Sequence, residues 1–192
     1  MRKGEIFIIS GPSGAGKTTL HKKLLADKKF GKRLVKSVSA TTRVRRPGEK
    51  DGRDYFFLTK KQFLYKKRAG HFLEWKKVFD NYYATPHTKV KEILRSGKNV
   101  LLCIDVQGAK TVIRKYPEAV TIFILPPSWH ALKDRLLGRA SETKASLKLR
   151  LDISRREMRE VKSYKYVVVN DQLTKGIKSL KSIFQKELGG IK

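Results

Sequence analysis

Apolar residues along this chain follow two patterns that alternate from one end to the other. Short continuous apolar runs are typical of strands buried on both faces of a sheet, whereas apolar residues spaced three or four positions apart are typical of covering helices. Runs of the first kind predict strands over 5–10, 55–58, 100–104, 120–125 and 166–169, and the segment 35–38 resembles a further short strand. Spacings of the second kind predict helices over 16–26, 60–69, 88–96, 109–115, 132–139, 147–163 and from 173 onward. This alternation predicts an α/β fold with a parallel sheet.

The stretch between 37 and 89 departs from the alternation. It begins with a polar, arginine-rich loop at 40–54 and continues with the aromatic segments 72–75 and 82–83. Aromatic residues are enriched in strands. We therefore expect a small, mostly β lobe inserted into the α/β core.

The first predicted strand runs directly into the segment I-S-G-P-S-G-A-G-K-T-T at 9–19. Its spacing of Gly11, four further residues, Gly16, Lys17 and Thr18 matches a phosphate-binding loop, and the strand before it and helix after it are the context that this loop requires. Glycines allow backbone N–H groups to converge on phosphate oxygens, and the helix N-terminus adds partial positive charge. We expect Lys17 to reach the β- and γ-phosphates and Thr18 to ligate Mg²⁺. The alternative is a glycine-rich turn without a ligand.

The net charge of the chain raises the question of whether its surface binds a polyanion. The 192 residues include 45 Lys and Arg against 17 Asp and Glu, a formal net charge of +28. Such a surface attracts polyanions. Either it is simply solvated or it also contacts RNA, and the sequence favours the first alternative because no RNA-binding signature or pattern of stacking aromatic residues stands out.

The remaining composition bears on the compartment. Cys103 is the only cysteine, so no intrachain disulfide can form and a reducing cytoplasm is expected. No apolar run approaches the roughly 20 residues that span a bilayer, and the N-terminus enters the first strand without room for a signal peptide. We expect no membrane partner, and the pattern gives no signal for an oligomeric state.

A second group of polar residues indicates a second phosphate site. Arg43 and Arg46, with Tyr55 nearby, form a forked set of donors suited to a phosphate group. Transfer between two phosphates needs positioning and charge neutralisation rather than a general base, and the four histidines share no spacing that suggests a base or a metal site. Three further arginines lie on segments that could cover the phosphates, namely Arg135, Arg139 and Arg150.

One carboxylate suggests which base the acceptor carries. Glu74 stands among apolar residues, where an unpaired charge is costly. A carboxylate can accept hydrogen bonds from N1–H and the 2-amino group of guanine, whereas adenine offers neither donor. Ser39 and Thr85 could serve the O6 side. The alternative, that Glu74 is an exposed strand residue, stays open at this point.

Together these segments resemble the guanylate kinase family over nearly the whole chain. The motifs that carry the resemblance are I-S-G-P-S-G-A-G-K-T-T, V-S-A-T-T-R-V-R-R-P-G-E-K-D-G-R-D-Y, H-F-L-E-W, N-Y-Y-A-T-P, I-D-V-Q-G-A, I-F-I-L-P-P-S, R-L-L-G-R and V-V-N-D. The resemblance implies a three-layer P-loop core (1–36, 90–127 and 151–192), a GMP-binding lobe (37–89) and a helical lid (128–150). It also implies that Mg²⁺-bound ATP phosphorylates GMP to GDP in purine nucleotide metabolism.

The resemblance assigns roles by position. It implies that ATP is bound by Gly11, Pro12, Ser13, Gly14, Ala15, Gly16, Lys17, Thr18, Thr19 and Asn170, with Asn170 beside the base and Thr18 also on the metal. It implies that GMP is bound by Ser39, Arg43, Arg46, Glu49, Tyr55, Glu74, Tyr83, Thr85 and Asp105, where Glu49 and Asp105 are supporting carboxylates and Asp105 lies near Mg²⁺ through water. The catalytic set that it implies is Lys17, Arg43, Arg135, Arg139 and Arg150.

Two positions and one segment depart from the family pattern. The segment is in the expected lid, where the chain has Gly138-Arg139-Ala140-Ser141-Glu142 and the family more usually has Gly-Arg-Gly-Thr. Cys103 stands where the family usually has an aspartate, and Ala84 stands where it usually has a glycine. Two other readings remain to be weighed: a scaffold module of the same fold, which the intact phosphate loop disfavours, and a kinase for another nucleoside monophosphate, which Glu74 with Thr85 disfavours.

Overall fold

The computed structural model describes residues 4–78, 80–138 and 144–189, with the side chains of 144–146 left aside. These residues form two compact units. We call residues 4–6, 35–102 and 107–119 the lobe unit, and residues 7–34, 103–106 and 120–189 the loop unit. The lobe unit thus holds the inserted lobe together with segments that the sequence had placed in the core.

The central sheet has five strands in the order β2-β7-β1-β8-β9. The strands are β1 (Ile6–Ser10), β2 (Leu34–Lys36), β7 (Asn99–Cys103), β8 (Val120–Leu125) and β9 (Tyr166–Val169). β1 and β8 pair in parallel, as do β8 and β9. Every residue of β1 is buried, as the continuous apolar run predicts for a central parallel strand. The α/β prediction is confirmed.

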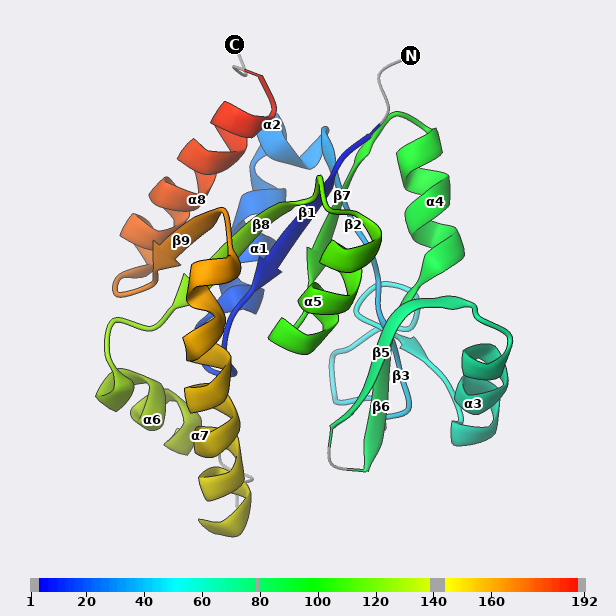
Figure 1. Ribbon diagram of the computed structural model, residues 1–192, viewed down its shortest axis with the longest axis horizontal. Helices are drawn as coiled ribbons and strands as arrows, with labels where there is room; N and C mark the ends of the chain where they lie inside the picture. Colours follow the sequence, from blue (N-terminus) through cyan, green and yellow to red (C-terminus); the bar gives the residue numbers. More distant parts are fainter. Residues whose placement is uncertain (1–3, 79, 139–143, 190–192) are drawn as a thin grey trace. The chain divides into compact units, whose positions relative to one another are not determined.

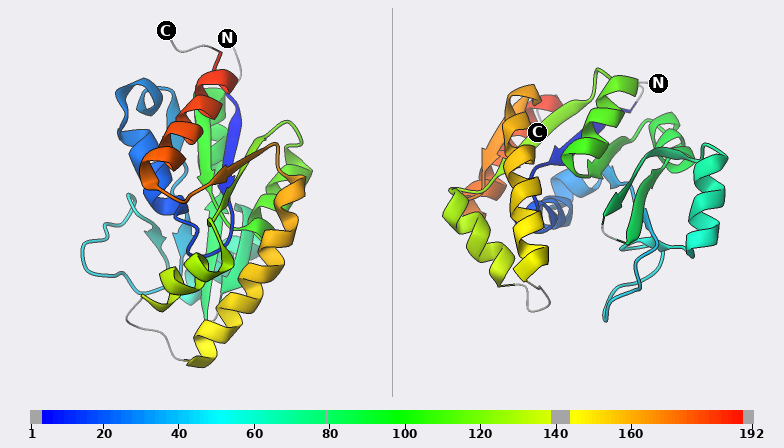
Figure 2. Two further views of the ribbon diagram at one scale, coloured as in Figure 1. Left: turned by 90° about the vertical axis from the view of Figure 1, so that its left-hand side faces the viewer. Right: turned by 60° about the horizontal axis from the view of Figure 1, so that its bottom comes forward.

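Helices of the loop unit surround its strands (Figure 1). They are α1 (Lys17–Ala26), α2 (Lys28–Gly31), α6 (Trp129–Leu137), α7 (Lys144–Met158), the 3₁₀ helix η1 (Arg159–Ser163) and α8 (Leu173–Glu187). α8 lies beside α1 (Figure 2) and sends Phe184 onto Phe7 of β1, with ring centroids 4.8 Å apart. This contact anchors the strand that leads into the phosphate loop.

The lobe unit contains a second sheet, ordered β4-β3-β6-β5. The strands of this sheet are β3 (Ala40–Thr41), β4 (Phe56–Phe57), β5 (Phe72–Val78) and β6 (Asn81–Pro86). The helices that follow these strands along the chain are α3 (Lys60–Arg68), α4 (His87–Arg95) and α5 (Val106–Lys115). α3 packs on β5 (Figure 2) through Phe63, whose ring centroid is 4.7 Å from that of Phe72. The expected mostly β insertion is present. Within α3, Phe63 is buried and the neighbouring Leu64 is half-buried.

Several boundaries differ from those that the pattern predicts. α5 begins at Val106 rather than at 109, and α6 begins at Trp129 rather than at 132 because the Ser128 hydroxyl caps it by accepting a hydrogen bond from the Ala131 N–H. The short elements α2 and β3 were missed, since four and two residues are too few to show a period. Within the described residues no helix has the length and apolar character needed to cross a membrane.

Candidate active site

The loop between β1 and α1 depends on glycine. Gly11, Gly14 and Gly16 have φ values of 138°, 86° and 91°, a region that other residues rarely adopt. A Cβ on Gly11 would lie 2.3 Å from the Ile124 carbonyl oxygen, and one on Gly16 would lie 2.2 Å from Nδ2 of Asn170. At Gly11 and Gly16 there is therefore no space for a side chain, as expected where backbone N–H groups have to approach a phosphate.

Lys17 is the first residue of α1 and folds back over this loop. Its Nζ donates hydrogen bonds to the carbonyl oxygens of Gly11 at 2.6 Å and Pro12 at 2.8 Å. The ammonium is thus held by the same backbone that would surround a phosphate. A bound triphosphate offers charged oxygens in place of these neutral carbonyls, and hydrogen bonds between charged groups are the stronger ones.

Asn170 and Arg135 meet at the far side of the loop. The buried Asn170 side chain donates from Nδ2 to the Ala15 carbonyl at 2.8 Å. Arg135 of α6 donates from Nη2 to the Asn170 carbonyl at 2.9 Å. Asn170 therefore supports the loop itself, a contact across 155 positions of sequence that no local pattern could reveal. Its predicted place beside the ATP base stays a prediction.

The other residues predicted on the donor side belong to the loop unit as well. Thr18 and Thr19 are exposed in the first turn of α1, and Arg150 is half-buried in α7. Asp105 is also in the loop unit, because the preceding Ile104 donates its N–H to the Ile9 carbonyl at 3.2 Å beside the end of β1. Its assignment to GMP is untested, while Arg139 lies outside the described residues.

The residues present fit a magnesium ion that arrives with ATP. In the described part of the chain no group of three or more His, Cys, Asp and Glu side chains could hold a metal. Mg²⁺ in nucleotide sites binds few protein ligands in addition to the phosphates, and it prefers oxygen. The Thr18 side chain, exposed in the turn after Gly16, offers an oxygen of this kind.

In the lobe unit, Arg43 and Glu49 form an ion pair. Arg43 Nη2 contacts both carboxylate oxygens, at 2.7 and 3.0 Å, and the Arg46 N–H donates to the same carboxylate at 2.9 Å. The hydrogen bond from Arg43 holds the pKa of Glu49 below its usual value. Glu49 thus fixes the arginine loop, whereas the Arg46 side chain remains exposed.

Two tyrosines adjoin this ion pair. The rings of Tyr55 and Tyr83 have centroids 6.2 Å apart in an edge arrangement, and the Arg43 guanidinium lies 5.5 Å from the Tyr55 ring centroid. The four residues Arg43, Glu49, Tyr55 and Tyr83 therefore form one cluster within the lobe unit, and their predicted contact with the GMP phosphate stays a prediction.

Glu74 is buried, with 6% of its surface exposed. β5 and β6 pair Glu74 directly with Thr85, and the Thr85 hydroxyl donates to Oε1 of Glu74 at 2.6 Å. Burial raises the pKa of the Glu74 carboxyl. The alternative that Glu74 is an exposed strand residue is wrong. Thr85, expected on the O6 side of guanine, instead directs its proton to Glu74, while Ser39 is half-buried just before β3.

Comparisons with known proteins agree with this geometry. The guanylate kinase family model matches residues 3–187. The chain belongs to the guanylate kinase family. The guanylate kinase of Clostridium tetani is 45% identical over 97% of this chain and 88% of its own length, and that of Clostridioides difficile is 42% identical over 97% and 90%. A crystal structure of guanylate kinase from Anaplasma phagocytophilum, 32% identical, superposes with a TM-score of 0.78 over 97% of this chain and 87% of that chain.

Of the three departures from the guanylate kinase pattern, the lid segment lies outside the described residues from position 139 onward, and the other two have different settings. Ala84 lies in the regular strand β6, 1% exposed, and packs with Ala40, Phe63 and Phe72. Its backbone is one that alanine adopts without strain, so the substitution is accommodated as expected. Cys103 is half-buried at the end of β7.

Sequence reasoning missed one residue of this guanylate kinase site. Lys115, at the end of α5, donates from Nζ to the Leu73 carbonyl at 2.8 Å, immediately before Glu74. It is 42 positions away in sequence. A lysine in a chain this rich in lysine carries no signal that would single it out.

Proposed function

We propose that this chain transfers the γ-phosphoryl group of ATP to GMP, giving ADP and GDP. The observation that carries the proposal is the buried Glu74 carboxylate, paired with Thr85 in the same unit as the Arg43 cluster. One unit then contains both a group suited to guanine and a group suited to its phosphate. The single Cys103 supports a cytoplasmic reaction.

The loop unit binds the donor. The amides of the glycine-dependent loop surround the phosphates of ATP, and Lys17 exchanges its carbonyl partners for phosphate oxygens. Thr18 would hold the Mg²⁺ that arrives with ATP, and the ion would supply positive charge to the phosphates. Arg135, whose Nη2 donates a hydrogen bond to the Asn170 carbonyl, is proposed to stabilise the transferring group. Arg139 and Arg150 are proposed in the same role.

The lobe unit binds the acceptor. The second pKa of a phosphate monoester is about 6, so the GMP phosphate is largely dianionic at neutral pH and attacks without a general base. Arg43 has five N–H donors, and its contacts with Glu49 and the Val44 carbonyl occupy only part of them. The remaining donors, with Arg46, Tyr55 and Tyr83, hold the phosphate against the repulsion of the donor.

Glu74 selects the base. Its ionised carboxylate accepts from N1–H and the 2-amino group of guanine. Adenine presents an acceptor at N1 and leaves the buried carboxylate without a partner there. A site built for such hydrogen bonds rejects the wrong ligand by about 10⁴.

An acceptor panel tests the proposal. ADP release is measured with GMP, AMP, UMP and dTMP at pH 7.5, and we expect GMP to exceed each of the others in kcat/KM by at least about 10³. Lys17→Met, which keeps the length of the stem without the charge, serves as the inactive control for contaminating kinases. Equal use of AMP, or release of ADP that Lys17→Met retains, would contradict the proposal.

A further inference from the structure

We propose that Lys115 is a positioning residue for base selection: it fixes the bend of β5 that orients Glu74 and supplies the positive charge that favours an anionic carboxylate there. The proposal rests on the proposed function, since it concerns how the guanine-selecting group is held. Nothing in the reaction itself requires Lys115 to contact a nucleotide.

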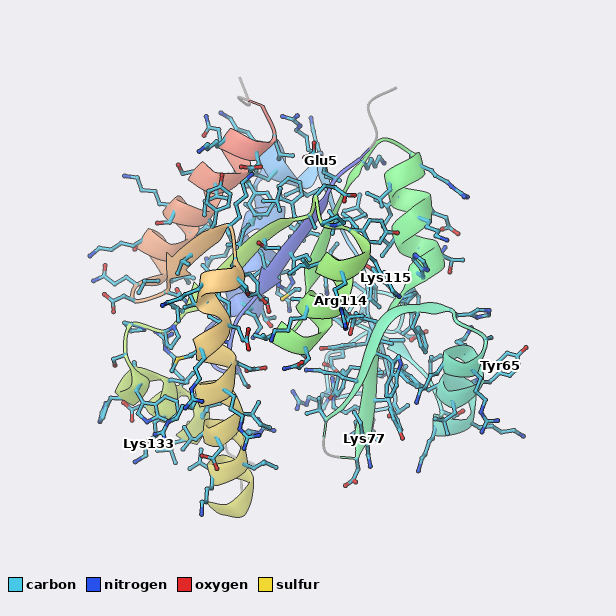
Figure 3. The ribbon with its side chains drawn as sticks, in the orientation of Figure 1. Glu5, Tyr65, Lys77, Arg114, Lys115 and Lys133 are labelled. Atoms are coloured by element: carbon cyan, nitrogen blue, oxygen red, sulfur yellow. The ribbon has the colours of Figure 1, made fainter. Side chains whose placement is uncertain are left out.

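The first support is the backbone geometry at Leu73. The pairing of β5 with β6 shifts register between Phe72 and Glu74, so Leu73 lies at an irregularity of the ladder. Such irregularities re-aim the side chains beside them. The Leu73 carbonyl accepts its hydrogen bond from Lys115 Nζ at 2.8 Å. The lysine at the end of α5 (Figure 3) therefore ties down the bend from which the Glu74 side chain projects.

The second support is the charge around Glu74. The groups that act on its carboxyl are Thr85 from β6, Lys76 from β5 itself and Lys115 from α5. Burial raises the pKa of Glu74, while the Thr85 hydrogen bond and the two lysines oppose the rise. Loss of Lys115 would move the balance toward the protonated acid.

The protonation state matters because it changes what Glu74 recognises. The carboxylate has only acceptors and matches two donors on guanine. The carboxylic acid has an O–H donor, which suits the N1 acceptor of adenine and leaves one guanine donor poorly matched. A site that loses its anion therefore loses affinity for GMP and also loses its penalty against AMP.

Lys115→Met tests this role, because methionine keeps an unbranched stem without the ammonium. kcat and KM for GMP and for AMP are measured from pH 5 to 8. We expect KM for GMP to rise about tenfold at pH 7 with a smaller change in kcat, and the acid limb of kcat/KM for GMP to move to higher pH. The ratio of kcat/KM for GMP to that for AMP should fall as well. Lys115→Arg, which keeps donor and charge, restores the parent profile within about twofold.

Arg114→Met is the matched control. Arg114 is exposed on the same helix one residue away (Figure 3), and the substitution removes the same charge. We expect its profile to follow that of the parent. A shift equal to that of Lys115→Met would show that overall charge, and not the contact with Leu73, is responsible, and would overturn the proposal.

Glu74→Gln removes the titrating group and completes a double-mutant cycle. We expect Lys115→Met to cause no further pH shift in that background. If the Lys115→Met protein is too unstable to assay, Lys115→Gln, which keeps a donor but no charge, must show the shift. Unchanged pH profiles in both neutral variants would refute the inference, whereas absence of GMP kinase activity in the parent would refute the proposed function instead.

Discussion

The candidate binding groups of the two units differ in kind. In the loop unit they are mostly backbone: three glycines have positive φ, two of them have no space for a side chain, and Lys17 donates to carbonyl oxygens. In the lobe unit it is side chains: Glu49 holds Arg43, and Thr85 holds Glu74. The difference follows what each must recognise. A phosphate is common to all nucleotides and needs only N–H groups, whereas a base must be distinguished by a particular donor and acceptor set.

Lys17→Met is expected to have the largest effect. It removes a cation from the phosphates of the donor, so kcat should fall by about 10²–10³ with every acceptor alike. Steady-state rates with GMP and AMP measure this. A change in the ratio of the rates with GMP and AMP would contradict the assignment of Lys17 to the donor alone.

Glu74→Gln should affect only acceptor choice. The amide keeps an acceptor for Thr85 but presents a donor where guanine needs an acceptor, so kcat/KM for GMP should fall by about 10² while KM for ATP stays constant. Isothermal titration with each nucleotide checks both halves of this expectation. Weaker ATP binding in this variant would contradict it.

The same substitution should stabilise the fold. Since burial raises the pKa of Glu74 in the folded state, the folded carboxyl binds a proton more readily than the unfolded one, and stability is lost as the pH rises through that raised value. Above it, Gln in place of the buried anion should increase the free energy of unfolding by about 1 kcal/mol. Urea titrations at pH 7.5 and pH 5 should show this gain shrinking at the lower pH. A gain that does not depend on pH would mean that Glu74 does not titrate as described.

Glu49→Gln tests whether the ion pair with Arg43 contributes to GMP binding. The amide cannot hold Arg43 by charge, so KM for GMP should rise about tenfold, equivalent to about 1.4 kcal/mol. The lowered pKa of Glu49 means that its ion pair is lost only as the pH falls through that low value. The acid limb that titration of Glu74 produces should therefore be present in both this variant and the parent. If the acid limb disappeared in Glu49→Gln, the limb would belong to Glu49 and not to Glu74.

The smallest effect is expected for Ala84→Gly, which restores the residue usual in the family. Ala84 packs in a regular strand, and glycine there costs backbone entropy and a buried methyl group. We expect a loss of about 1 kcal/mol in the free energy of unfolding with kcat/KM within about twofold of the parent. Thermal unfolding and the GMP assay measure the two quantities. A large gain in activity would mean that Ala84 obstructs the site.

The same contrast explains what sequence could predict. The phosphate-loop motif is contained in eleven consecutive residues, the first two of which end the fully buried strand β1. The sequence alone could therefore predict a phosphate-binding loop there. Glu74 could be suspected but not placed, because its burial depends on the pairing of β5 with β6 and on a partner 11 residues away. The contacts of Lys115 with Leu73 and of Asn170 with Ala15 cross 42 and 155 residues and left no local signal. Short elements such as β3 could not be predicted for the same reason, since only pairing with distant strands defines them.

The most direct measurement is a crystal structure of the chain with GMP bound. The account predicts the Glu74 carboxylate within hydrogen-bonding distance of N1 and the 2-amino group of guanine, and the phosphate on Arg43 and Arg46 with Glu49 still paired to Arg43. Guanine bound elsewhere, with Glu74 still directed only at Thr85, would contradict it.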